Sequence, residues 1–479
     1  MRNRYLLILI SSILVLSSLA SAQTLDGDWS VEYVTPDNEF VPNSTGQRTI
    51  SVAALGEDIF VALAANYGVD TYYLVGYKNA NHETGLLGTY PYSAEGLEMK
   101  WIDGFNQVFL HSPKDISSLE NIVYVANNDV NHNIVTFELK DDSIYTNPKR
   151  FKTGSRDLWA IDVDKNGFVF VTVAGDSITP GSVLIYDGSV WNSQGTAGSL
   201  LHEIILPEPG EARGITVNQD GSILYVSNYL SKQIYCYTGD PVNGYTRFDG
   251  FSFSANTSYE VGSVTLDVGP WGLQFMDSKN LLFVGHDASF AREEGYNYGR
   301  YYVLNPNSGE ILDTIDVAKW NFSQSGVYNN PDTLGTASGY AATYNLDFDE
   351  NNNLYCAAYY GWSIEKWVYS KELPTIELTL TSVEVVNQTI PNEVSLKQNY
   401  PNPFNPTTTI EFQLNKQENV SLKIFNLNGE LVANLINKKD FGAGTYRVTF
   451  DASNLASGNY VYQLNTATKK LAGKMTLLK

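Results

Sequence analysis

The sequence predicts an all-β protein: a six-bladed β-propeller, with seven blades as the alternative, followed by an immunoglobulin-like β-sandwich. The composition favours strands and turns, because the chain has 32 Tyr and 38 Gly against 4 Met, and aromatic residues suit strands while Gly suits turns. Short alternating strands recur across residues 24–373 without helical periodicity, which is typical of a repeat built from small sheets. A chain of 479 residues also exceeds one ordinary domain.

The N-terminus has the pattern of a secretory signal peptide. Arg2 and Arg4 give a positive start, an apolar run extends from Leu6 to Leu16, and Ala20-Ser21-Ala22 is a cleavage pattern before Gln23. A membrane anchor is the alternative, but the apolar run is short for a spanning helix and several Ser residues interrupt it. We therefore predict a signal peptide over residues 1–22. No later apolar run is long enough to cross a membrane, so we expect a mature chain that does not span one.

Residues 23–373 form the predicted propeller domain, in which six units share a first strand, a turn, a second strand such as LYVS, and a third strand. The second strands are predicted at Asp58–Ala62, Ile122–Ala126, Phe168–Val173, Ile223–Ser227, Leu281–Gly285 and Leu354–Ala358. The last unit lacks a fourth strand, and Trp29–Val34 can supply it. Such closure would leave no open sheet edge. A degenerate seventh unit at Leu97–Leu110 is the alternative.

Two segments of this region, LYVSNYLSKQIYCY and LNPNSGEILDTIDV, resemble the YVTN/NHL-like propeller superfamily. The resemblance implies a fold and leaves the chemistry open. Residues 374–395, which begin at a Pro, are predicted to be a linker.

Residues 396–479 consist of alternating runs divided by Gly-containing turns, as in a small sandwich. The motifs NYPNPFNPTTTIEF, VSLKIFNLNGELV, SGNYVYQL and KLAGKMTLLK resemble the type A C-terminal sorting domain of the type IX secretion system, with a departure at Asn415, where many members have Pro. The resemblance implies the type IX machinery as partner and a location outside a Gram-negative cell, secreted or on its surface. It also implies removal of the domain after export. A carbohydrate-binding or adhesive sandwich is the alternative.

Aligning the six units on the leading apolar residue of each first strand brings six side chains into register. The first strand of each propeller blade lines the central channel, so residues at its start form a ring at one mouth. The residues two positions before the leading apolar residue are the candidate ligand-binding ring: Arg48, Lys114, Trp159, Arg213, Trp271 and Tyr344. Arg156 or Asp157 replaces Trp159 if the strand of the third unit begins earlier.

Three cations and three aromatic rings suit a sugar with acidic groups. Sugar CH faces stack on aromatic rings, and guanidinium groups pair with carboxylate or sulfate. The same residues have a structural interpretation, in which the cations pair with Asp115, Asp157 and Glu211 and the rings simply fill the channel. The sequence leaves both interpretations open.

No motif indicates a metal site or a catalytic site. Asp162-x-Asp164-x-Asn166-Gly167 and Asp347-x-Asp349-x-Asn351 begin like calcium loops, but the twelfth position holds Val173 and Ala358 in place of Glu. We predict hairpin turns at both places and no cofactor. A structural Ca²⁺ is the alternative, because the protein is acidic and exported. Nucleophile-elbow, P-loop and zinc motifs are missing, and only His111 and His286 of the five His fall near a predicted mouth. Cys236 and Cys356 lie in strand-like runs and either pair or stay buried thiols.

The net charge excludes one class of partner. The chain has a net charge of −21, and the acidic excess lies in the propeller region, which argues against nucleic acid as a partner. We expect a non-catalytic binding protein for a glycan or polysaccharide. A secreted polysaccharide lyase or hydrolase at the same mouth is one alternative, and a structural or adhesive surface protein is the other.

Overall fold

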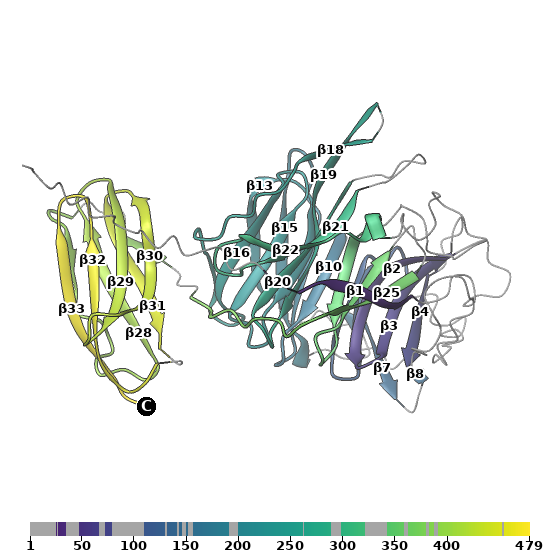
Figure 1. Ribbon diagram of the computed structural model, residues 1–479, viewed down its shortest axis with the longest axis horizontal. Coiled ribbons are helices and arrows are strands. Elements are labelled where there is room, and N and C mark those ends of the chain that lie inside the picture. The colour runs from purple at the N-terminus through teal and green to yellow at the C-terminus, as the bar shows by residue number, and fades with distance from the viewer. Residues whose placement is uncertain are drawn as a thin grey trace, which may run out of the picture.

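The computed structural model consists of two all-β bodies joined by one segment (Figure 1). It describes residues 25, 27–34, 47–66, 72–78, 110–129, 132–140, 143–145, 150–151, 157–190, 200–261, 263–288, 298–320, 343–358, 363–379, 383–387, 391–452 and 455–479. The predicted signal peptide lies outside these residues and stays a prediction.

Six sheets form the first body, and each sheet is one blade of the propeller. Blade 1 holds β2 (Gln47–Gly56), β3 (Ile59–Asn66) and β4 (Tyr72–Lys78), and blade 2 holds β5 (Asp115–Leu119), β6 (Ile122–Asp129), β7 (His132–Lys140), β8 (Ser143–Tyr145) and β9 (Arg150–Phe151). Blade 3 holds β10 (Leu158–Val163), β11 (Phe168–Val173), β12 (Pro180–Asp187) and β13 (Leu200–Pro209), with a 3-10 turn at Gly188–Val190.

The second half of the ring repeats this layout. Blade 4 holds β14 (Ala212–Val217), β15 (Ile223–Asn228), β16 (Gln233–Asp240) and β17 (Gly244–Arg247), and blade 5 holds β18 (Ser258–Val261), β19 (Val264–Met276), β20 (Leu281–Ala288), β21 (Gly299–Leu304) and β22 (Ile311–Ile315). A helical turn at 317–320 follows β22. Blade 6 holds β23 (Thr343–Phe348), β24 (Leu354–Ala358), β25 (Ser363–Tyr369) and, out of chain order, β1 (Trp29–Val34).

Neighbouring blades share one hydrophobic core at each seam. Successive side chains of a strand point to opposite faces, so a second strand buried on both faces is almost continuously apolar. In β15, Leu224 and Val226 pack toward blade 3, whereas Ile223 and Tyr225 pack toward blade 5. Six such cores join the blades in a closed series from blade 1 back to blade 1.

The ring has six blades and is closed by the N-terminal strand, as predicted. β1 pairs antiparallel with β25, with Trp29 opposite Tyr369 and Val34 opposite Glu365. The inner strands β2 and β5 contact each other directly, and so do β2 and β23. No further sheet therefore lies between blades 1 and 2 among the described residues, which argues against a seventh blade there. The alternative unit at Leu97–Leu110 itself falls, apart from Leu110, outside the described residues.

The second body is the predicted sandwich. One sheet has the order β26-β31-β28-β27 and the other β30-β29-β32-β33. Its strands are β26 (Val383–Asn387), β27 (Ser395–Leu396), β28 (Thr407–Leu414), β29 (Glu418–Asn426), β30 (Leu431–Phe441), β31 (Gly444–Asp451), β32 (Gly458–Asn465) and β33 (Lys470–Leu477). Every second residue of β28 is buried between the sheets, so the period-2 pattern alone explains this core.

The predicted linker 374–395 is not a single linker in the structure. Leu373 and Ile376 pack into the core between blades 5 and 6, and the Ile376 amide donates to the Lys279 carbonyl at 2.9 Å. Further on, β26 lies inside the predicted linker but joins the sandwich by pairing with β31. Both domains therefore extend into this segment, since Ile376 packs on the propeller and the backbone of β26 pairs with the sandwich.

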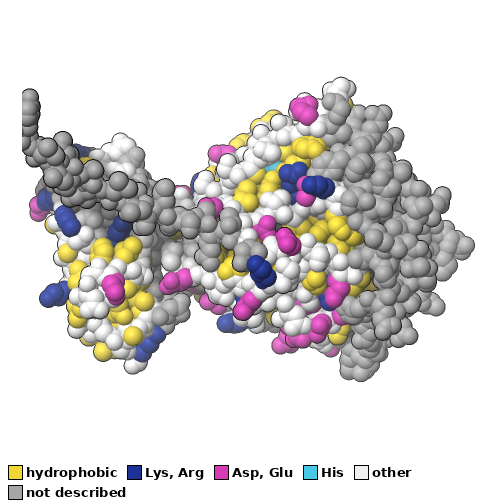
Figure 2. Space-filling model, in the orientation of Figure 1, with side chains coloured by type: hydrophobic (Ala, Val, Ile, Leu, Met, Phe, Trp, Pro, Cys, Tyr) yellow, Lys and Arg dark blue, Asp and Glu magenta, His cyan; other side chains and the backbone are white. Residues whose placement is uncertain are grey.

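Within the described residues, no helix has the length and apolar character needed to cross a membrane. Acidic side chains are scattered over the face of the propeller seen in Figure 2. Cys236 and Cys356 are free, buried thiols in blades 4 and 6.

Candidate functional site

The six ring positions lie at the starts of the six inner strands. Arg48, Trp159, Arg213 and Tyr344 are second residues of their strands, Lys114 directly precedes β5, and Trp271 lies within the longer β19. The side chain of Arg48 is outside the described part of the chain, whereas its backbone pairs with Ala65. The structure brings the other five side chains together.

Arg213 is the centre of this cluster. Its guanidinium carbon lies 3.8 Å from the ring centroid of Trp271, 4.2 Å from that of Tyr229 and 4.8 Å from that of Trp159. Each is a cation–π distance. Arg213 also forms an ion pair with Glu211, and only 9% of its side chain is exposed.

The aromatic rings continue the cluster around the mouth. Trp271 stacks on Tyr344 with centroids 3.9 Å apart, and Trp159 lies 6.1 Å from Trp271. The Lys114 Nζ is 5.2 Å from the Trp159 centroid. Trp271 is buried, while Lys114, Trp159 and Tyr344 are half-buried. These three therefore form the outer face of the cluster, over a floor of Arg213 and Trp271.

Two glycines allow the inner strands to approach this closely. A Cβ on Gly214 would lie 2.1 Å from the Trp271 carbonyl oxygen, and one on Gly272 would lie 2.1 Å from the Tyr344 carbonyl oxygen. Each glycine directly follows a ring residue, so the contact between the neighbouring ring side chains depends on it. The dipeptides Arg213-Gly214 and Trp271-Gly272 were available in the sequence as a signal for this approach.

The cluster contains donors without acceptors. Among the described residues, Nε and Nη1 of Arg213 and Nε1 of Trp271 are buried and make no hydrogen bond. Burial lowers the pKa of Arg213, against the opposing effect of Glu211. Buried donors that lack partners are uncommon in proteins and often mark a site for water or ligand.

Tyr229 belongs to this site but was missing from the prediction. It follows β15, whose end returns to the mouth at which β14 starts, and its hydroxyl donates to the Asp267 carbonyl at 2.8 Å. Lys232 Nζ lies 4.0 Å from its ring and 2.7 Å from the Asp267 carboxylate. The signal available in the sequence was the position of Tyr229 just after the second strand of blade 4.

A polar belt crosses the channel below the ring. The residue directly after each leading apolar position is polar in all six blades: Ser51, Ser117, Asp162, Thr216, Gln274 and Asp347. Asp162 accepts hydrogen bonds from Ser117 Oγ at 2.8 Å and from Thr216 Oγ1 at 3.0 Å, and so joins blades 2, 3 and 4. The alignment that gave the ring also contained this belt, one residue beyond the leading position.

A second acidic residue, Asp115, extends the belt. Its carboxylate accepts from Ser51 Oγ at 2.7 Å, from Asn345 Nδ2 at 2.7 Å and from the Ile161 amide at 3.0 Å. The structural interpretation paired Asp115 with a ring cation, whereas these three contacts are with the inner strands of blades 1, 6 and 3. Asp115 and Asp162 together accept hydrogen bonds from the inner strands of blades 1, 2, 3, 4 and 6.

The channel opens into a cavity at the mouth opposite the ring. The cavity has a volume of about 370 Å³ and is lined by belt residues such as Asp162 and Asp347 together with first-turn residues such as Lys165, Asp277 and Asn352. Burial raises the pKa of Asp347 and Asp115 to about 7 and that of Asp277 to about 6. The charge of Asp162 raises the pKa of all three further, so Asp347 and Asp277 in the cavity lining and Asp115 in the channel above it hold protons at higher pH than ordinary carboxyls do.

These shifts predict that the propeller loses stability as the pH rises from about 4 to about 7. The unfolded carboxyls have a pKa near 3.9, so the folded state binds more protons across this interval and its stability falls with pH. Each carboxyl whose pKa is about 7 should lower the free energy of unfolding by on the order of 2 kcal/mol between pH 5 and pH 8. We therefore expect a lower midpoint of thermal unfolding at pH 8 than at pH 5. Asp347→Asn should flatten the profile. A midpoint that rises from pH 5 to pH 8 would contradict this account.

The remaining candidates have structural surroundings. Asp164 and Asp349 form the predicted hairpin turns, since one carboxylate oxygen of each accepts two amides of its own loop at 2.9–3.0 Å. His286 is buried in blade 5, where its Nδ1 lies 2.8 Å from the Tyr298 hydroxyl. Burial lowers the pKa of His286 to about 3, which keeps the ring neutral. His111 is exposed before β5.

The second body matches a known protein family. Residues 398–477 match the family model described as "Secretion system C-terminal sorting domain". The sandwich is therefore a type IX sorting domain, and the protein is exported to the outside of a Gram-negative cell of the Bacteroidetes type, secreted or on the surface. No curated protein matches the chain.

Solved structures with similar strand arrangements are distant. The periplasmic gluconolactonase PpgL of Pseudomonas aeruginosa is 9% identical with a TM-score of 0.41, and the match covers 89% of this chain and 99% of that one. The gluconolactonase XC5397 of Xanthomonas campestris is 11% identical with a TM-score of 0.39, covering 74% and 93%. The Dos1 propeller is 13% identical with a TM-score of 0.34, covering 68% and 69%. Such weak similarities do not bear on activity.

Proposed function

We propose that this exported propeller is a non-catalytic binding protein that holds an acidic polysaccharide at the mouth formed by Lys114, Trp159, Arg213, Trp271 and Tyr344. The observation that carries the proposal is the Arg213 guanidinium, which pairs with Glu211 but leaves Nε and Nη1 without an acceptor among the described residues. A carboxylate or sulfate group matches the paired N–H donors of a guanidinium.

The surrounding rings supply the rest of a saccharide site. Trp159 and Tyr344 are half-buried and border the mouth, so a sugar CH face can stack on either ring. Lys114 stands beside Trp159 and adds a second cation for a charged chain. The Arg213 donors are covered when the mouth is empty, and ligand entry requires the Trp159 or Tyr344 ring to turn aside.

Replacing Arg213 with Ala is expected to weaken binding of a polyuronate or a sulfated polysaccharide at least tenfold, because the charge-assisted hydrogen bonds are lost. Isothermal titration of the mature chain, with uncharged dextran as the comparison ligand, measures this. Arg247→Ala is the matched control, because Arg247 is also in blade 4, pairs with Asp249 and lies 5.2 Å from an aromatic ring, that of Tyr235. It should bind as the wild type does.

Trp159→Ala provides a second test if Arg213→Ala unfolds the protein. Binding unchanged in both variants, or no binding to the wild type, would overturn the proposal. Conversion of the polysaccharide to shorter products would instead identify the lyase or hydrolase alternative.

A structural or adhesive role is the second candidate. It is favoured by the burial of Trp271, which is only 7% exposed, and by its stacking on Tyr344, since both contacts fill the mouth. Under this role, Trp159→Ala and Arg213→Ala would lower the midpoint of thermal unfolding while no polysaccharide binds.

A further inference from the structure

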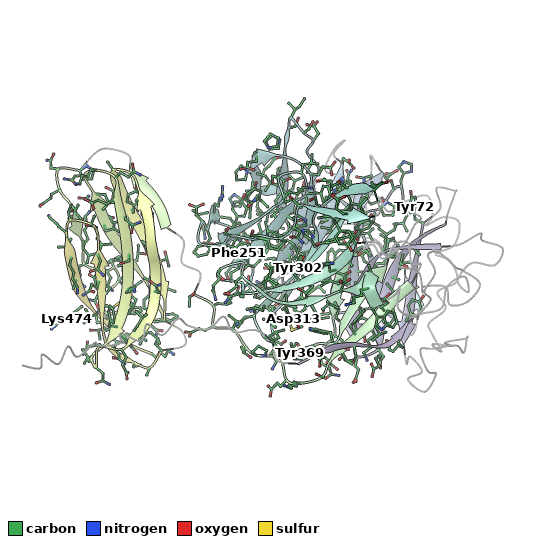
Figure 3. The ribbon with its side chains drawn as sticks, turned by 45° about the horizontal axis from the view of Figure 1, so that its top comes forward. Tyr72, Phe251, Tyr302, Asp313, Tyr369 and Lys474 are labelled. Carbon is green, nitrogen blue, oxygen red and sulfur yellow. The ribbon has the colours of Figure 1, made fainter. Side chains whose placement is uncertain are left out.

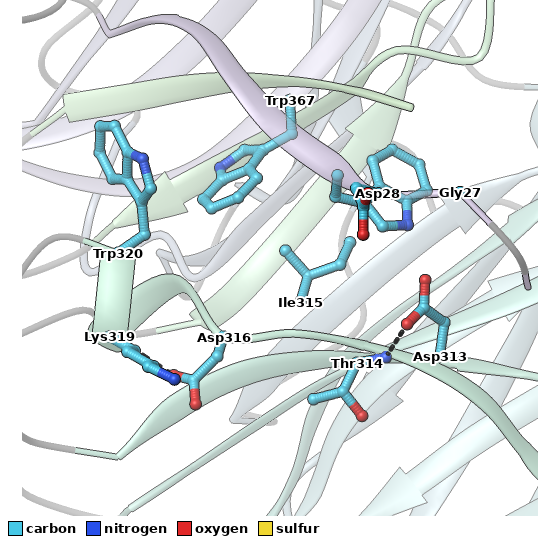
Figure 4. Close-up of a pocket in the computed structure, with 10 residues that line it drawn as sticks. Gly27, Asp28, Asp313, Thr314, Ile315, Asp316, Lys319, Trp320 and Trp367 are labelled. Atoms are coloured by element: carbon cyan, nitrogen blue, oxygen red, sulfur yellow. Dashed lines mark hydrogen bonds between the residues drawn. The ribbon is translucent and has the colours of Figure 1, made fainter. Parts of the chain in front are cut away.

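A groove on the outside of the propeller, at the seam between blades 5 and 6, lies apart from the channel. Its volume is about 350 Å³, within the range of small-molecule pockets. One side comes from the start of β1, the other from β22 and the helical turn after it, and the floor from β25 (Figure 4). Asp313, on the β22 side, and Tyr369, which flanks β1, are marked in Figure 3.

Three tryptophans form the apolar part of the groove. Trp320 and Trp367 meet edge to face with centroids 5.6 Å apart, and Ile315 lies beside them (Figure 4). Trp29 packs on Tyr369 with centroids 5.1 Å apart. Trp367 is buried, whereas Trp29 and Trp320 are half-buried and present ring surface to the groove.

Carboxylates border the rings. Asp28, Asp313 and Asp316 line the groove together with Lys319, and Asp316 is paired with Arg300 at 3.3 Å. Asp28 and Asp313 therefore carry the negative charge that the groove offers a ligand. One oxygen of Asp313 accepts the Thr314 amide at 2.7 Å. Burial raises the pKa of Asp313, and the buried indole N–H of Trp29 beside it acts in the opposite direction.

We infer that this groove is a second saccharide site, which takes an uncharged pyranose residue. The half-buried indoles of Trp29 and Trp320 offer stacking surfaces for the CH face of a sugar. Carboxylates accept hydrogen bonds from sugar hydroxyls, and Asp28 and Asp313 supply such acceptors in the groove. Asp28 and Asp313 disfavour acidic sugars, so the groove and the cationic mouth select opposite ligands.

The groove includes β1, the strand that closes the ring, so ligand binding should also affect the thermal stability of the propeller. A ligand in contact with Trp29 and Trp320 joins β1 to blade 5 and binds only the folded propeller. It should therefore raise the midpoint of thermal unfolding with concentration.

The test is isothermal titration of the mature chain with hexaoses of the cello, malto, laminari, xylo and manno series, and with hexagalacturonate as the acidic ligand. We expect at least one neutral hexaose to bind. Trp320→Ala and Asp313→Ala should each weaken it at least tenfold, and the midpoint of thermal unfolding should rise with that hexaose in the wild type.

Arg213→Ala and Trp159→Ala at the mouth are the controls, and both should bind the neutral hexaose as the wild type does. This separates the two sites, because Trp320→Ala should in turn leave binding of an acidic polysaccharide unchanged. The inference is overturned if no neutral hexaose binds, if both groove variants bind as the wild type does, or if hexagalacturonate binding depends on Trp320.

Discussion

Replacing Asp162 with Ala is expected to lower the free energy of unfolding of the propeller by about 3–5 kcal/mol. The Asp162 carboxylate accepts four hydrogen bonds: two from hydroxyls of blades 2 and 4, and two from the Val163 and Val217 amides at 2.8 Å. Ala leaves all four donors without this acceptor. A buried donor that loses its partner costs about 1–3 kcal/mol, and partial relaxation reduces the sum.

Urea unfolding followed by tryptophan fluorescence measures this effect on the propeller alone. All 8 Trp residues precede residue 374, so the sorting domain does not contribute to the signal. Asp176→Ala is the control, because Asp176 also accepts two amides at 2.7 Å but lies in an exposed turn where water replaces it. An Asp162→Ala midpoint equal to that of Asp176→Ala would contradict the belt as a source of stability.

Replacing Lys366 with Met should destabilise the propeller by a comparable amount, about 3–5 kcal/mol, because it leaves buried acid without its cation. Lys366 is 2% exposed on β25, and its Nζ lies 2.7 Å from Asp58 in blade 1 and 2.8 Å from Glu32 on the closing strand. One side chain thus ties β1, blade 6 and blade 1 together.

The double variant Lys366→Met with Asp58→Asn should recover much of the loss, since the remaining buried charge is removed. Lys279→Met is the matched control: Lys279 pairs with Glu372 at 3.1 Å, but 89% of the Glu372 side chain is exposed, and such pairs contribute about 0–1 kcal/mol. If the double variant is as unstable as Lys366→Met alone, the buried charge is not the cause.

The propeller was predictable because one local pattern is repeated. Strands such as Ile223–Asn228 must be apolar on both faces, since each face meets another blade, and this leaves a signal in every unit. Closure by Trp29–Val34 followed from the missing fourth strand of the last unit. The strand Val383–Asn387 was assigned to the linker because it pairs with β31, some sixty residues later, and its local sequence does not reveal that partner.

The ring was predictable in position but not in burial. Strand starts fix which residues meet at the mouth, and the alignment placed Trp159, Arg213, Trp271 and Tyr344 correctly. Whether Arg213 is covered depends on Tyr229 and on the close approach that Gly214 allows, which are contacts between blades. The groove could not be predicted from the sequence for the same reason, because Trp29 and Trp320 are brought together only by ring closure.

The pairing of β1 with β25 also affects how the protein withstands proteases outside the cell. The two ends of the propeller segment are hydrogen-bonded neighbours in one sheet, from Trp29 opposite Tyr369 to Val34 opposite Glu365. A single cut in a loop between blades divides the propeller into two fragments, and these stay joined without a covalent bond by the two seams at which they meet and, through the ring closure, by the pairing of β1 with β25.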